Sequence, residues 1–370
     1  MTSADSPPDR GPVAVEVRAP ARIHLGMMSF GVPEVRSFGG VGVMIDRPGV
    51  HVRLRRAEKF SARGPLAERA LEFAQACIRA WELEAGGGCA IEVVLVPGSH
   101  TGLGSGTQLG LAVAAGVRHL FRTRPAGPPR SPRPVHESLD PFAEDWLFDT
   151  SDAIELARAV GRGRRSCIGV HGFSRGGLIV EGGRLVAPGP AEHDATRPFS
   201  PMVARVRLPS AWRCVTLVQR DAIGLHGDAE RSAFAALPPV PLEVSAELAR
   251  IALMDLVPAA VEAKFAEFAD AIYRYGLLAG KPFEAASSRL PHAAATTQII
   301  ELLGELGVRG AAQSSWGPAV MACCESLDHA GTLVDQLESL GMHEHYDTFI
   351  ARFDTQGAVL RELSSPDRVR

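Results

Sequence analysis

The sequence lacks the features that mark secreted, membrane and nucleic-acid-binding proteins. Its six cysteines show neither CxxC spacing nor a compact disulfide framework, so reduced, buried thiols are expected. No run reaches about 18 uninterrupted apolar residues, and the polar, proline-rich N-terminus has no apolar segment of the signal-peptide type. The formal net charge is −3, without the basic excess on which non-specific nucleic-acid and membrane binding depend. These absences predict a cytoplasmic protein without a nucleic-acid or membrane partner, and they leave room for a small anionic ligand.

The length and composition fit a globular chain of two domains. The 370 residues are 46% hydrophobic and 22% charged, which is ordinary for a folded protein. Alternating apolar and polar positions predict strand, turn and strand over residues 13–28, with the turn at Pro20. The same pattern over residues 39–60 places a turn at residues 47–49. Helix and strand patterns mix along the remaining chain, which predicts an α+β fold.

Composition shifts suggest where the domains begin and end. We expect a disordered leader over residues 1–12, an N-terminal domain over 13–190 and a C-terminal domain over 200–365, because Pro, Gly and polar residues cluster between the last two. Residues 122–150 read as a surface insertion, since five prolines and four arginines precede an acidic block there. A lid over a ligand is the alternative interpretation of this insertion.

One glycine-rich stretch, GLGSGTQLGLAVAAG at residues 102–116, follows a predicted strand and opens a predicted helix. Small residues let backbone N–H groups close on a phosphate, toward which the positive end of the helix dipole points. No lysine follows the loop, so it is not a Walker A loop, and no acidic residue stands where a Rossmann fold requires one. A turn that is glycine-rich for steric reasons alone is the alternative. The phosphate-binding candidates are Gly102, Leu103, Gly104, Ser105, Gly106, Thr107 and Gln108.

Three further segments carry candidate ligand-binding side chains. In RAPARIHLG, Arg22 and His24 lie on one side of a predicted strand, where a lone histidine often has only a structural role. The segment GRGRRSCIGVHGFSRGG and the segment GAAQSSWGPAV supply cations, hydrogen-bond donors and an aromatic wall, although a solvated basic loop and a helix-entry turn would look the same. Their candidate residues are Arg162, Arg164, Arg165, His171 and Arg175 in the first, and Gln313, Ser314, Ser315 and Trp316 in the second.

Taken together, these motifs resemble a known superfamily. PARIHLG, PGSHTGLGSGTQLGLA and QSSWGPAV resemble the three motifs of the GHMP kinases, in this order and over nearly the whole chain. GLGSGTQ, the arginine-rich segment and QSSWGP are similar to its β-ribofuranosylaminobenzene 5′-phosphate synthase branch. The resemblance implies a two-domain α+β fold with the ligand cleft between the domains, a homodimer and Mg²⁺. It also implies the joining of 5-phosphoribosyl diphosphate to 4-aminobenzoate or 4-hydroxybenzoate, with release of CO2 and diphosphate, in tetrahydromethanopterin biosynthesis.

One position favours the synthase over a kinase. Related kinases carry an aspartate base in an SGxD segment, whereas this chain has Gly169 at that position. Loss of such a base costs a kinase roughly a hundredfold or more in rate. In the synthase reaction, CO2 leaves the attacking ring carbon, so no proton has to be removed. A GHMP small-molecule kinase using ATP and a catalytically silent ligand-binding homologue stay open as alternatives.

The resemblance also assigns roles to the candidate residues. The glycine loop would bind the diphosphate, and Arg164, Arg165 and Arg175 would bind the 5-phosphate or the benzoate carboxylate, in an order that stays open. Arg22 and His24 would face the cleft, with Ser166, His171 and the segment from Gln313 to Ser315 as substrate contacts and Trp316 stacking on the aromatic ring. Ser105 and Glu155 are the nearest counterparts of the kinase metal ligands, although the spacing places Arg158 at the glutamate position.

Overall fold

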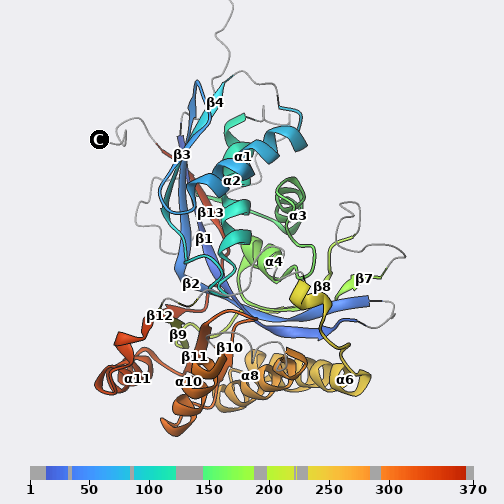
Figure 1. Ribbon diagram of the computed structural model, residues 1–370, viewed down its shortest axis with the longest axis vertical. Coiled ribbons are helices and arrows are strands. Elements are labelled where there is room, and N and C mark those ends of the chain that lie inside the picture. Colours follow the sequence, from blue (N-terminus) through green and yellow to red (C-terminus); the bar gives the residue numbers. More distant parts are fainter. Residues whose placement is uncertain are drawn as a thin grey trace, which may run out of the picture.

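The computed structural model describes residues 14–31, 36–83, 87–121, 145–186, 198–220, 222, 232–283 and 293–363. The expected leader and nearly all of the expected insertion at 122–150 lie outside these residues. Two β-sheets with helices packed on their faces make up the described chain (Figure 1). Among its helices, none combines the length and the apolar character needed to cross a membrane.

The larger sheet is built on two long antiparallel strands, β1 and β2. Its main path runs β3-β4-β2-β1-β13-β5, while β6 and β7 pair with β2, and β8 pairs with β6. The strands are β1 (Ala14–Ser29), β2 (Arg36–Ala57), β3 (Ser61–Arg63), β4 (Gly88–Leu95), β5 (Asp145–Leu147), β6 (Leu178–Glu181), β7 (Arg184–Leu185), β8 (Met202–Val206) and β13 (Val359–Glu362).

Each predicted strand pair at the N-terminus is one continuous strand in the structure. The ladder between β1 and β2 continues on both sides of Pro20. Ala19 pairs with Val50 and Ala21 pairs with Ile45, so residues 46–49 form a bulge opposite the proline. Proline has no N–H to donate to a ladder and is therefore tolerated at such a bulge. The predicted turns at Pro20 and 47–49 are this irregularity, and the strands themselves do not end there.

Four helices cover one face of the larger sheet (Figure 1). They are α1 (Ala67–Ala80), α2 (Ser105–Phe121), α3 (Thr150–Ala159) and α4 (Ile168–Arg175). The central helix, α2, is Ala-rich and buried along most of its length, because it packs against both long strands and against the other helices. Asp149 and Asp152 form a capping box at the start of α3.

The smaller sheet has the order β10-β11-β9-β12 and helices on both faces. Side chains alternate along β9: Val215 and Leu217 face α10 and α11, whereas Cys214 and Val218 face a core shared with α8 and with the larger sheet. The elements are β9 (Arg213–Gln219), α6 (Leu242–Arg250), the π-helix η1 (Ile251–Leu256), α7 (Val257–Val261), α8 (Phe265–Gly280), the 3-10 helix η2 (Lys281–Phe283), α10 (Ala293–Glu305), β10 (Ala311–Gln313), β11 (Ala319–Cys324), α11 (Leu327–Ser339), the 3-10 helix η3 (Met342–Glu344) and β12 (Tyr346–Arg352).

The two sheets are joined by shared strands as well as by a shared core. β8 and β13 follow the expected domain boundary in sequence, yet both pair within the larger sheet, β8 with β6 and β13 with β1. The division at residues 190–200 therefore stays a prediction, and the C-terminal half contributes two strands to the sheet that begins at residue 14. The mixed α+β architecture confirms the predicted fold class.

Candidate functional site

One buried hydroxyl joins three distant segments of the chain. Ser314 Oγ accepts a hydrogen bond from the His24 backbone N–H at 3.0 Å and donates one to the Gly102 carbonyl at 2.8 Å. The Ser314 side chain is fully buried. Strand β1, the glycine loop and the turn after β10 therefore meet at one point, as the three motifs of the sequence predicted.

Arg22 fixes the conformation of the glycine loop. Its guanidinium donates to the Gly102 carbonyl at 3.0 Å, and its backbone N–H donates to the Leu103 carbonyl at 3.1 Å. Gly104 has a φ of +71°, and a methyl group placed on it would lie 2.5 Å from Arg22 Cγ. Glycine is required at position 104 both by the backbone conformation and by this approach.

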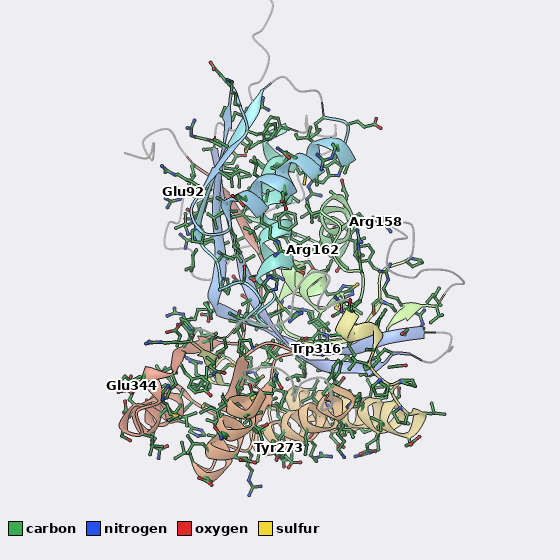
Figure 2. The ribbon with its side chains drawn as sticks, viewed as in Figure 1. Glu92, Arg158, Arg162, Tyr273, Trp316 and Glu344 are labelled. Carbon is green, nitrogen blue, oxygen red and sulfur yellow. The ribbon has the colours of Figure 1, made fainter. Side chains whose placement is uncertain are left out.

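Two arginines stand at the N-terminus of α2. A methyl group placed on Gly106, in the first turn, would lie 3.1 Å from Arg69 Nη2 and 3.5 Å from Arg162 Nη2. Both guanidinium groups also lie over the ring of Phe73, at 5.9 Å and 5.0 Å from its centre. Figure 2 shows Arg162 beside α2. First-turn N–H groups lack helical acceptors, so this helix end with its two cations is a candidate anion site, called here the cradle and defined by Ser105, Gly106, Arg69 and Arg162.

His24 is neutral and held in one tautomer. Burial, and to a smaller degree the positive charge of Arg22, lower its pKa to about 3. Its Nδ1 accepts the Gly26 N–H at 3.1 Å, so the ring proton is on Nε2, which faces Ser166 Oγ at 3.1 Å. His24 thus connects the arginine-rich segment to β1, and its backbone carbonyl accepts the Ser315 N–H at 2.8 Å.

Gly169 lies directly against the glycine loop. Its carbonyl accepts a hydrogen bond from Gln108 Nε2 at 2.8 Å, and a methyl group built on it would lie 3.4 Å from Thr107 Cγ2 and 3.7 Å from Arg22 Cγ. A side chain at position 169 would therefore point at the cradle side of the loop. In this chain that space holds no carboxylate.

Five aromatic rings gather beside the turn that carries Ser314. This aromatic cluster consists of Phe30, Phe38, Phe234, Phe283 and Trp316, whose neighbouring ring centres are 5.1 to 6.1 Å apart. The Arg165 guanidinium lies 5.0 Å from the centre of the Phe234 ring. Figure 2 shows Trp316 near the junction of the larger sheet with the C-terminal helices. An apolar, aromatic wall with one cation beside it suits an aromatic carboxylate.

The cradle and the aromatic cluster are neighbours. Trp316 stands between Ser315, which bonds to His24, and Gly317, on which a methyl group would lie 2.4 Å from Gly102 Cα. On the other side, Arg165 precedes Ser166, the partner of the His24 ring. The site therefore offers a candidate anion position on one side of the contact between Gly102 and Gly317, and an aromatic position on the other.

Other predicted residues lie elsewhere. Arg164 is exposed, and Arg175 is exposed at the far end of α4, about 9 Å along the helix axis from Gly169. His171 is buried, and its Nε2 bonds to the Ser200 carbonyl. Gln313 donates to the Gly317 carbonyl at 3.0 Å and so holds the turn. Roles for these residues in substrate contact stay predictions that no contact in the structure supports.

The expected metal pair is not brought together. Ser105 Oγ donates to the Gly98 carbonyl at 3.4 Å, whereas Glu155 pairs with Arg118, also at 3.4 Å. Arg118 is 13 residues beyond Ser105 on α2, which corresponds to about 20 Å of helix. These two residues do not fit a shared Mg²⁺ ion, and the magnesium prediction now depends on the resemblance alone.

Sequence reasoning missed Arg69 and four of the five clustered rings. Arg69 is a half-buried residue of an ordinary amphipathic helix, and Phe30, Phe38, Phe234 and Phe283 are scattered over more than 250 residues. The arginine and the rings become neighbours only after folding. No spacing rule in the sequence marks them.

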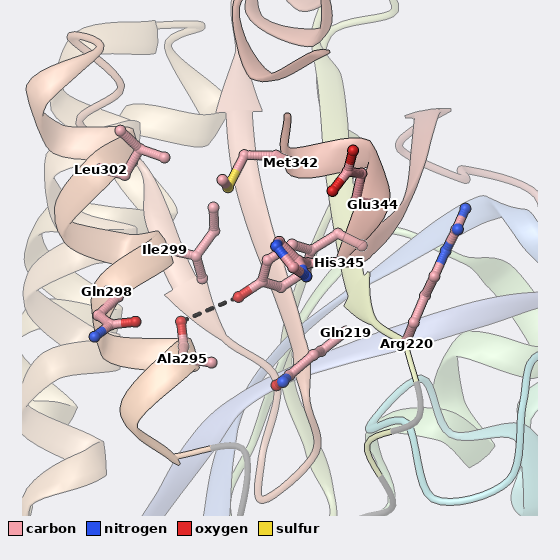
Figure 3. A pocket seen from close by; sticks show the side chains of 10 residues that line it. Gln219, Arg220, Ala295, Gln298, Ile299, Leu302, Met342, Glu344 and His345 are labelled. Atoms are coloured by element: carbon pink, nitrogen blue, oxygen red, sulfur yellow. Dashed lines mark hydrogen bonds between the residues drawn. The ribbon is translucent and has the colours of Figure 1, made fainter. Parts of the chain in front are cut away.

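A separate cavity of about 580 Å³ lies in the C-terminal half (Figure 3). It is lined by residues of α10, η3 and the ends of β9 and β12, and Tyr346 donates a hydrogen bond to the Ala295 carbonyl across it at 3.1 Å. Its lining includes none of the cradle or cluster residues. Hollow shape alone therefore does not identify the site, whereas the meeting of the three motifs does.

Comparison with known proteins agrees with the motifs. No family model matches the chain. A β-ribofuranosylphenol 5′-phosphate synthase from Archaeoglobus fulgidus is 30% identical over 345 residues, covering 90% of this chain and 94% of that protein. This chain belongs to the β-ribofuranosylphenol 5′-phosphate synthase family. A second synthase of that name, from Methanothermobacter thermautotrophicus, is 27% identical and covers 82% of the chain and 87% of its own length.

This synthase has the fold of the GHMP kinase superfamily. A homoserine kinase from Cytophaga hutchinsonii superimposes with a TM-score of 0.57 at 15% identity, over 97% of this chain and 99% of the kinase. A mevalonate pyrophosphate decarboxylase from Streptococcus pyogenes gives 0.61 at 12% identity, over 93% and 98%. The predicted enzyme class is confirmed, the solved structures support the predicted fold, and the relatives' names give a phenol where the resemblance gave an aminobenzene.

The pKa of His24 predicts a specific acid sensitivity of this synthase. The unfolded chain takes up a proton on His24 near pH 6.5, whereas the folded protein resists it down to about pH 3, so this group lowers the free energy of unfolding as the pH falls below 6.5. His24→Asn keeps an oxygen near the Nδ1 position for the Gly26 N–H and removes the titration. In urea unfolding, the free energy of unfolding should fall between pH 7 and pH 5, and this fall should be smaller by about 2 kcal/mol in the variant. The exposed His343→Asn is the control; a His24→Asn drop equal to that of the wild type would contradict the burial argument.

Proposed function

We propose that the protein transfers the phosphoribosyl group of 5-phosphoribosyl diphosphate to 4-aminobenzoate or 4-hydroxybenzoate, with release of CO2 and diphosphate. One observation carries the proposal: the glycine loop connects a cationic helix N-terminus to the turn of Trp316, whose aromatic cluster has its own arginine. A diphosphate leaving group suits the first and a benzoate suits the second. The relatives' names, with a ribofuranosyl 5′-phosphate joined to a phenol, support the same pair of substrates.

The reaction needs charge stabilisation more than it needs a base. The bond from ribose C1 to the diphosphate oxygen breaks, and its electron pair leaves with diphosphate, toward the α2 N-terminus, Arg69 and Arg162. The ring carbon that bears the carboxylate bonds to C1. The bond from that carbon to the carboxylate then breaks, and its electrons restore the aromatic ring as CO2 departs. Since no proton is removed, Gly169 and a neutral His24 are compatible with every step.

The arginine beside the rings gives the acceptor its orientation. Arg165 lies over Phe234, so a benzoate against the rings would have its carboxylate within reach of the guanidinium. In the transition state the carboxylate becomes neutral CO2. A single cation therefore suffices to hold it without blocking its departure. Mg²⁺ bound to the diphosphate and participation in tetrahydromethanopterin biosynthesis are parts of the same proposal.

The test is one incubation with Mg²⁺, 5-phosphoribosyl diphosphate and each carboxyl-labelled benzoate in turn. We expect labelled CO2 only when the donor is present, and the benzoate that releases more label is the acceptor. Donor binding without release of label from either benzoate would favour a silent homologue. Release of ADP from ATP with an added alcohol, and no labelled CO2, would favour a kinase.

Gly104→Ala should abolish donor binding. The methyl group would lie 2.5 Å from Arg22 Cγ at a φ of +71°, so both the loop and its arginine must move. We expect at least about a hundredfold lower kcat/KM for the donor, measured with the labelled acceptor at saturation. Gly341→Ala is the matched control, because Gly341 has a φ of +74° with nothing near its methyl position. Equal donor affinity in the two variants would refute the cradle assignment.

Arg165→Met should act on the acceptor alone. It keeps much of the apolar contact with Phe234 and removes the cation, so the KM for the benzoate should rise at least about tenfold, while donor affinity, measured by calorimetry, stays within about twofold. Arg250→Met, at the last residue of α6, controls for loss of a surface charge. A donor defect as large as the acceptor defect would place Arg165 at the diphosphate.

A further inference from the structure

Three metal-ligand side chains are buried together beside the site, and the proposed reaction uses none of them. Cys167 and His171 are one helical turn apart at the start of α4, and Glu181 is the last residue of β6. None of the three is more than 3% exposed. Their sulfur, one ring nitrogen and one carboxylate oxygen lie within 4.8 Å of one another.

The His171 ring is oriented as a ligand. Its Nε2 lies 2.8 Å from the Ser200 carbonyl, which only accepts hydrogen bonds, so Nε2 carries the ring proton. The lone pair is then on Nδ1, which is buried and has no hydrogen-bond partner. A backbone carbonyl that fixes the tautomer in this way is the usual outer partner of a metal-bound histidine.

Glu181 is prepared in the same manner. One carboxylate oxygen, Oε2, accepts the Cys167 backbone N–H at 2.7 Å, while Oε1 is buried without a hydrogen-bond partner. Two acceptor atoms, His171 Nδ1 and Glu181 Oε1, are therefore buried in one cluster without a hydrogen bond of regular geometry among the described residues, although the Ser166 and Ser200 hydroxyl groups lie close to the Glu181 carboxylate. Leaving such groups unpaired costs several kcal/mol, and a cation would satisfy both.

We propose that Cys167, His171 and Glu181 bind a Zn²⁺ ion through Sγ, Nδ1 and Oε1, with a water molecule as fourth ligand. On binding, the Cys167 thiol releases its proton to solvent and the thiolate bonds to the metal. One thiolate and one carboxylate neutralise the two positive charges, so the buried group is neutral overall. A sulfur, nitrogen and oxygen set selects Zn²⁺ over Mg²⁺, which prefers oxygen ligands.

The ion has a structural role next to the catalytic cleft. It ties the start of α4 to the end of β6, and the residues on either side of Cys167 reach the site. Ser166 contacts the His24 ring, and Gly169 accepts the hydrogen bond from Gln108. Zinc at this position would hold both contacts in register without touching substrate.

Metal analysis tests the proposal independently of activity. The full chain, produced without a metal-binding tag in zinc-supplemented medium and passed through metal-free buffer, should retain about one zinc per molecule by mass spectrometry. Cys167→Ser and Glu181→Gln should each lower the zinc content at least about fivefold, because each removes one anionic ligand. Cys214→Ser, a substitution of an equally buried thiol in β9, should retain the wild-type content.

Cobalt gives a second measurement that needs no variant. Co²⁺ added to metal-free wild-type protein should produce a thiolate-to-cobalt charge-transfer band and visible bands of tetrahedral strength. Absence of the charge-transfer band, or zinc content in Cys167→Ser equal to that in wild type, would overturn the proposal. A protein that releases CO2 but holds no zinc would refute the zinc site and leave the proposed reaction intact.

Discussion

The site depends on a single buried hydroxyl with a donor on one side and an acceptor on the other. Ser314 accepts a hydrogen bond from the buried His24 amide and donates one to the Gly102 carbonyl, which also accepts from the Arg22 guanidinium. An unpaired buried polar group costs roughly 1 to 3 kcal/mol. The Ser314 hydroxyl therefore stabilises the contact among the three segments. The position of the glycine loop relative to β1 follows from this bridge.

Two candidate binding regions of different chemistry lie around that bridge. Backbone dipoles and the arginines near α2 favour a negatively charged group. The clustered rings provide an apolar wall with Arg165 beside it. A kinase on the same fold needs a carboxylate near the loop to take the proton of the accepting alcohol, whereas the proposed reaction removes no proton. Gly169 keeps that position neutral, so one scaffold serves two chemistries through a change in local charge.

The sequence predicted the parts that depend on local spacing. The helix after the glycine loop follows from a short motif, and the anion-binding role of that loop stays a prediction from the same motif. What it could not predict depends on tertiary neighbours: Arg69 and four aromatic rings gather only through folding, and Pro20 sits at a bulge that its partner strand determines. The suggested metal pair, Ser105 and Glu155, lies apart because Glu155 contacts Arg118, about 20 Å along α2 from Ser105. Motif counting does not show which turn of a neighbouring helix a side chain reaches.

The last described strand has a consequence for how the enzyme is made. β13 pairs with the first residues of β1, so the sheet that presents Arg22 and His24 is completed only by residues about 340 positions later in the chain. Those residues must be synthesised before this edge of β1 is paired. Nascent chains will thus pass through a long interval in which an exposed sheet edge awaits its partner, and chaperone binding during that interval would protect them from aggregation.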